Sequence, residues 1–193
     1  MKKALAAILL PAFAGCFSMT ATPVARTEWN VAGVARETLT AEPKFGVTRL
    51  SQIVVRAPYD VRNFAVERAD LSTAFDPYNL FASAPAQLLK GAVHDHLAES
   101  GLFKAVVSSS SAANADAVAE VTITELKLQS GEEANSSDRL DAVVELSILV
   151  LNEKRVIIAS AKGSGRIDAK SAPYSTAFSK ALSVAMVKAM KDL

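Results

Sequence analysis

The strongest pattern in this chain of 193 residues is the alternation of apolar and polar side chains in its C-terminal half. Every second residue from Val144 to Val150 is apolar, and similar alternation lies beyond two polar segments, residues 130–139 and 152–154. Because successive side chains of a strand point to opposite faces, this spacing predicts strands with one buried face. Short polar connections join antiparallel neighbours. We therefore predict an antiparallel meander of three strands: residues 117–129, 141–152 and 155–164.

The first of these strands changes parity along its length. Val121 and Ile123 share one face. Leu126 and Leu128 would lie on the opposite face of a regular strand. An inserted residue restores such a pattern, because a shift of one residue exchanges the two faces. The sequence therefore predicts a β-bulge at residues 124–125.

Two longer segments have helical spacing. In residues 85–100 apolar side chains recur at steps of three and four, Pro85 suits a first turn, and Gly101 suits the position after the last turn. Residues 172–193 repeat this spacing and place polar side chains opposite the apolar stripe. Three shorter segments are predicted to be strands: residues 51–56, 64–68 and 102–107. The expected fold class is α+β, a twisted and mostly antiparallel sheet with two main helices packed on one face.

The N-terminus carries an export pattern. Lys2 and Lys3 precede an apolar stretch, and small residues lead into Cys16, the only cysteine of the chain. A basic start, a short apolar core and small residues before a cleavage point are typical of a secretory signal. The twelve residues from Ala4 to Gly15 are too few for a bilayer-spanning helix, which needs about 20.

Residues 13–16, with the sequence Phe-Ala-Gly-Cys, resemble a lipobox, in which the cysteine thiol is acylated and the chain is cut before it. Acyl chains such as palmitate on Cys16 would hold the protein on a membrane surface. Phe17, rather than an aspartate, follows the cysteine, and this favours the outer membrane. The alternatives are a plain signal peptide with an incidental cysteine, or an N-terminal helix that is not cleaved.

The expected organisation has three parts: a signal peptide at residues 1–15, a lipidated N-terminus and tether at 16–44, and a single α+β periplasmic domain at 45–193. Within the tether, Trp29, Val31 and Val34 are candidates for docking on the domain. Without Lys2 and Lys3, the 21 basic and 20 acidic side chains become 19 and 20. A nearly neutral domain has no global electrostatic reason to bind nucleic acid.

Catalytic and metal-binding patterns are missing from the sequence. The only histidines are His94 and His96, and residues two apart on a helix point in different directions, so they cannot easily hold one metal ion. Residues 163–165, Gly-Ser-Gly, do not match the nucleophile elbow, and we interpret their glycines as a bulge or a close backbone approach. We therefore expect no enzyme activity, no cofactor and no metal, with a small-ligand binder or enzyme kept as a minor alternative.

The most function-like segment is the aromatic stretch at residues 74–81, where Asp76-Pro77 favours a turn. We expect a loop or short bend whose Phe75, Tyr78 and Phe81 are candidate partner-binding residues. The alternative is that these aromatics fold under the helix that follows. The polar connection at residues 130–139 is a second candidate contact.

Several segments together carry a family resemblance: Cys16 and its tether, residues 52–56, the helix end at 100–103, the Ala-Asp start of the strand at 115–121, and the closing helix with Tyr174, Phe178 and Leu182. In these the chain resembles the ABC-type transport auxiliary lipoprotein family. Members are periplasmic lipoproteins that accompany MCE-type, lipid-handling ABC transporters, including the paraquat-inducible kind.

The resemblance implies a non-enzymatic docking or assembly component of an envelope lipid transport system. Its expected partners are a membrane, reached through lipidated Cys16, and the MCE-domain protein of the transporter, with a homo-oligomer implied by analogy. The expected location is the cell envelope, lipid-anchored at the outer membrane and facing the periplasm. A different envelope assembly lipoprotein, such as a secretion component or an activator of cell-wall synthases, is the alternative function.

Overall fold

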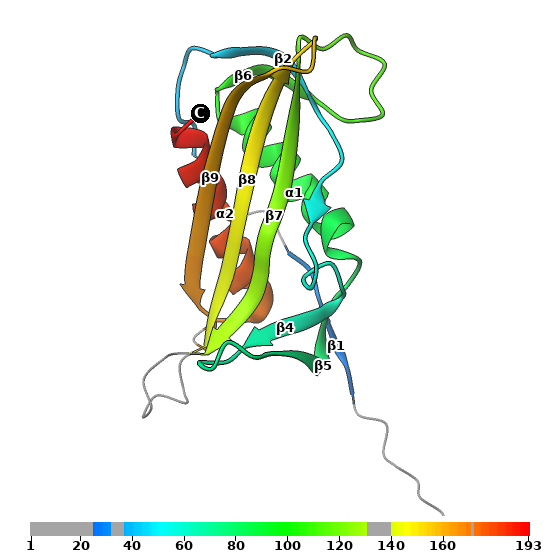
Figure 1. Ribbon diagram of the computed structural model, residues 1–193, viewed down its shortest axis with the longest axis vertical. Coiled ribbons are helices and arrows are strands. Elements are labelled where there is room, and N and C mark those ends of the chain that lie inside the picture. Colours follow the sequence, from blue (N-terminus) through cyan, green and yellow to red (C-terminus); the bar gives the residue numbers. More distant parts are fainter. Residues whose placement is uncertain (1–24, 32–36, 131–139, 171) are drawn as a thin grey trace, which may run out of the picture.

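Three long strands form the meander that the alternation predicts. In the computed structural model, which describes residues 25–31, 37–130, 140–170 and 172–193, β7 (Ala117–Ser130) pairs with β8 (Leu140–Asn152), and β8 pairs with β9 (Ile157–Asp168), all antiparallel (Figure 1). The register between β7 and β8 shifts between Ile123 and Glu125. The predicted bulge is confirmed, and it keeps Ile123 and Leu126 on the same buried face.

The other side of β7 is occupied by three short parallel strands in succession. β2 (Phe45–Leu50), β3 (Val54–Val55) and β4 (Asn63–Glu67) pair with its start, middle and end. β6 (Phe103–Val107) extends the sheet beside β2. The strand expected at residues 51–56 is therefore only two residues long, because the chain turns away at Arg56, whose backbone N–H still bonds to Ile123.

The aromatic segment is a strand and not the expected loop. β5 (Thr73–Phe81) runs antiparallel to β4, and its last residues pair in parallel with β1 (Thr27–Trp29). The register with β4 shifts between Asn63 and Ala65, so the middle of β5 bulges out. Pro77 lies in this irregular part, where its missing N–H removes no bond of the ladder. The local sequence therefore indicated the irregularity at Asp76-Pro77, but not the pairing of β5 with β4 and β1.

The folded part begins before residue 45, within the segment assigned to the tether. Trp29 packs edge-on against Tyr174, with ring centroids 5.6 Å apart, and Val31 is buried in the core. The docking expected of these two residues is confirmed, while Val34 lies outside the described residues. The described part of the chain thus forms a nine-stranded mixed sheet that includes β1.

Two helices cover one face of this sheet, as expected, in an α+β fold (Figure 1). α1 (Pro85–Glu99) packs near β3 and β6, and α2 (Tyr174–Lys191) packs on β8 and β9. Gly101, in the left-handed conformation at φ 79°, ends α1. Gly163 and Gly165 of β9 face α2 so closely that an added Cβ would overlap its backbone carbonyl oxygens. The close backbone approach inferred for these glycines is confirmed.

This contact predicts the effect of one substitution. Gly165→Ala should lower the free energy of unfolding by about 1–3 kcal/mol, because the methyl group would push α2 off the sheet. Gly91→Ala is the matched control: it lies on the exposed side of α1 with open space around it, and alanine should stabilise that helix by about 0.5–1 kcal/mol. Urea unfolding followed by circular dichroism measures both. Equal stability of the two variants would contradict the packing argument.

Candidate functional site

The structure separates the three aromatic candidates of β5. Phe75 and Tyr78 are 46% and 50% exposed, whereas Phe81 is 2% exposed. Phe81 packs against Phe64 and Phe178, with ring centroids 4.6 and 5.3 Å away. Phe81 is therefore a core residue, which corrects its expected role in partner contact. Phe75 and Tyr78 remain predicted contact residues.

Asp76 holds the bulge that turns Tyr78 outward. One carboxylate oxygen accepts the backbone N–H groups of Tyr78 and Asn79 at 2.7 and 3.1 Å, and the other accepts the Asn79 side-chain amide at 2.8 Å. The indole N–H of Trp29 donates to the Asn79 side-chain oxygen at 2.8 Å. The Asn63 amide donates to the backbone carbonyl of Asp76 at 2.9 Å. These bonds tie the bulge to both neighbouring strands.

A third exposed apolar side chain lies at the turn between β4 and β5. Leu71 is 76% exposed and has φ 65°, a left-handed conformation that leucine rarely adopts. Asp70 stabilises the turn by accepting the N–H and hydroxyl of Ser72, and these two bonds hold the pKa of its carboxyl below the usual value. Leu71, Phe75 and Tyr78 are called the hairpin surface below.

The opposite end of the molecule carries a second apolar surface (Figure 1). Val156, Ile157 and Ile158, where β9 begins, are 56%, 56% and 50% exposed. The turn before them is fixed by Asn152, whose side-chain oxygen accepts the Val156 N–H at 3.0 Å. We call these three residues the β9 apolar run. Sequence reasoning assigned them to a strand and missed their exposure, although three consecutive apolar residues already break the alternation.

The face of the sheet away from the helices is polar, and a buried lysine lies on it beside β4. The Lys127 ammonium bonds both carboxylate oxygens of Glu67 and one of Glu125, each at 2.9 Å. Burial lowers the pKa of Lys127, but its hydrogen bonds to Glu125 and Glu67 outweigh this, so the pKa lies above its ordinary value. Burial also raises the pKa of the nearby Tyr59, and Lys127 opposes that shift.

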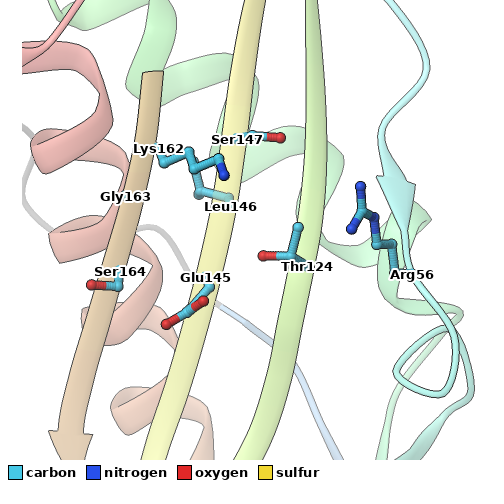
Figure 2. A pocket seen from close by; sticks show the side chains of 8 residues that line it. All are labelled: Arg56, Thr124, Glu145, Leu146, Ser147, Lys162, Gly163 and Ser164. Atoms are coloured by element: carbon cyan, nitrogen blue, oxygen red, sulfur yellow. The ribbon is translucent and has the colours of Figure 1, made fainter. Parts of the chain in front are cut away.

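Next to this cluster, a cleft of about 480 Å³ opens on the same face. Figure 2 shows Arg56 at the β3 side of the cleft and Lys162 of β9 at the other, with Thr124 of β7 and Ser147 of β8 between them. Glu145 adds a carboxylate to the lining. The cleft is broad and open to solvent, with a positive balance of charge that suits weak contacts with anionic groups. The cluster and the cleft were both missed from the sequence, because their residues come from distant segments.

The histidines do not form a site with each other. His96 is buried on the helix face that meets the core, and His94 Nδ1 lies 3.2 Å from the neighbouring Asp95 carboxylate. Among the residues that the structure describes, no three His, Cys, Asp or Glu side chains come together as metal ligands. No helix in this same part of the chain is both long and apolar enough to span a membrane. Cys16 and residues 131–139 lie outside the described residues, so both predictions stand as made.

Removing the Lys127 charge should strongly destabilise the fold. Lys127→Met should lower the free energy of unfolding by about 3 kcal/mol, because it leaves Glu67 buried without its partner. Adding Glu67→Gln should restore much of the loss. Lys162→Met is the matched control, since this exposed lysine makes no ion pair among the described residues, and it should change stability by less than about 0.5 kcal/mol. A similar loss in both lysine variants would contradict the assignment.

The raised pKa of Lys127 predicts a dependence on pH. Its stabilising contribution is complete below the unfolded lysine pKa of about 10.4 and is lost as the pH rises through the higher folded pKa. The raised pKa of Tyr59 acts in the same direction. Unfolding free energy should therefore fall above about pH 10, and it should fall less in Lys127→Met. Urea titrations across this range measure both slopes, and identical slopes would contradict the prediction.

No family model and no curated protein matches the chain. Solved structures do share its fold. Protein XCC0632 from Xanthomonas campestris, described as family DUF330, has a TM-score of 0.67 at 15% identity, over 86% of this chain and 92% of that one. An uncharacterized protein has a TM-score of 0.51 at 14% identity, over 83% and 95%. A dodecameric PelC variant from Paraburkholderia phytofirmans has a TM-score of 0.40 at 13% identity, over 79% and 94%. At these identities the first two likenesses concern the fold alone, which this chain shares with the DUF330 protein XCC0632.

Proposed function

We propose that this protein is a membrane-anchored auxiliary lipoprotein of an ABC-type, MCE-associated envelope lipid transport system. In this role it is a docking or assembly component without enzymatic activity. Cys16 carries the lipid anchor, and the folded domain faces the periplasm. Two observations support the proposal: the chain shares its fold with a DUF330 protein, and its meander and two helices follow the order expected from the sequence.

The β9 apolar run is the observation that carries the docking role. Three consecutive apolar residues exposed on a surface are avoided unless they serve a contact. The run lies at the end of the molecule opposite β1, the strand nearest to Cys16 in sequence (Figure 1). A chain anchored through Cys16 can therefore present this end away from its membrane. A periplasmic protein that bridges from a transporter would meet the β9 apolar run first.

Site-specific crosslinking in cells tests the identity of the partner. A photoreactive amino acid at position 157 should crosslink the MCE-domain protein, whereas the same group at position 180, on the exposed side of α2, should not. Mass spectrometry identifies the products. Crosslinks to secretion or peptidoglycan-synthesis proteins would support the alternative envelope function and overturn the transport proposal. Equal crosslinking from both positions would show that the run is not a specific contact.

A charge within the run should weaken the same contact. Ile157→Asp is expected to reduce binding of the MCE-domain protein about tenfold or more, because burying an unpaired carboxylate in the interface should cost more than the roughly 1.4 kcal/mol that corresponds to a tenfold change. Val184→Asp is the matched control, since Val184 is an exposed valine on α2 outside the run. Binding assays and circular dichroism on both purified variants separate lost contact from lost folding. Unchanged binding by folded Ile157→Asp would contradict the docking role.

A further inference from the structure

We propose that the hairpin surface, formed by Leu71, Phe75 and Tyr78, contacts the lipid bilayer that holds the anchor. The inference rests on the proposed function, because it takes Cys16 to be acylated. It goes beyond that function by assigning a second membrane contact to the folded domain. The hairpin would thereby set how the domain stands on the membrane.

The covalent chain brings the hairpin near the bilayer. Thr27 follows Cys16 by eleven residues, so the two can be at most about 40 Å apart. Thr27 pairs with Asn79, and this pairing places the start of the folded chain on β5 itself. The chain that follows Cys16 therefore enters the fold on β1, which pairs with the last residues of β5, the strand that carries Phe75 and Tyr78.

The hairpin surface has the shape and composition for a lipid surface. Leu71 lies at the turn between β4 and β5 and is the most exposed large apolar side chain of the described residues. Tyrosine has an apolar ring and a polar hydroxyl, and it is enriched where a membrane meets water. Exposed Arg68 lies at the hairpin turn, and exposed Arg26 precedes β1, the strand that pairs with β5. Basic side chains near a membrane attract anionic headgroups, while the exposed Asp70 carboxylate beside Leu71 offsets part of this charge. These features favour a bilayer over a protein partner.

Local hydrogen bonds keep two of these side chains, Leu71 and Tyr78, directed toward solvent. A leucine in the left-handed region is less stable there than an asparagine or glycine would be. The turn nevertheless holds Leu71 outward with Asp70 and Ser72, as Asp76 holds the bulge at Tyr78. Contact with lipid explains why leucine occupies this position, because its apolar side chain then leaves water.

Depth-dependent fluorescence quenching tests the contact. The full lipidated protein is placed in vesicles of phosphatidylethanolamine and phosphatidylglycerol, with an environment-sensitive probe on Phe75→Cys, since acylated Cys16 does not react. Nitroxide-labelled lipids should quench this probe and shift its emission to the blue. The control probe, on Lys154→Cys in the β8–β9 turn at the other end, should show neither effect. Equal quenching or equal protection at both positions would overturn the inference.

A second variant separates lost contact from lost folding. Leu71→Asn combined with Tyr78→Ser removes apolar surface. Asparagine suits the left-handed turn, and the backbone N–H at position 78 still donates to the Asp76 carboxylate. Folding should be retained and quenching of the probe at position 75 should be largely lost. Unchanged quenching would contradict the role of these side chains.

Intact-mass measurement of Cys16 tests the anchor separately. An unmodified Cys16 refutes the anchor, and an acylated protein without quenching refutes only the hairpin contact.

Discussion

The rest of the structure depends on β7, because this strand is hydrogen-bonded along both of its sides. β8 follows one side for nearly its full length, while β2, β3 and β4 occupy the other in turn. Segments from the whole chain are thereby joined into one sheet with two helices on one face. The bulge after Ile123 is essential to this arrangement, because it keeps apolar residues of both halves of β7 directed at the helices.

The same bulge creates the charged cluster on the open face. In a regular strand, Lys127 would have the parity of Ile123 and would point into the core. The inserted residue moves Lys127 to the opposite face, where Glu67 and Glu125 neutralise it. One local irregularity therefore provides both a continuous apolar core and an ion cluster that joins β4 to β7.

The two ends of the molecule carry different exposed apolar surfaces. The hairpin surface lies on β5 and the turn before it, at the same end of the molecule as β1, the strand nearest in sequence to Cys16, and the β9 apolar run lies at the other end (Figure 1). A long meander connects them, so contact at one end fixes the direction in which the other end points. This polarity is what the proposed docking role requires, because a docking component must present its contact surface away from its anchor.

The sequence by itself determined the meander, the bulge, both helices and the glycines under α2, because each of these follows from periodicity or sterics among near neighbours. Only the tertiary structure decided that residues 73–81 form a strand and that Trp29 belongs to the domain, since β1 and β5 are about fifty residues apart and recognise each other through pairing and the bond from Trp29 to Asn79. It also decided which aromatics are exposed. Phe75, Tyr78 and Phe81 are alike in local sequence, and their separation into surface and core follows from the Asp76 bulge and from the position of Phe64 and Phe178.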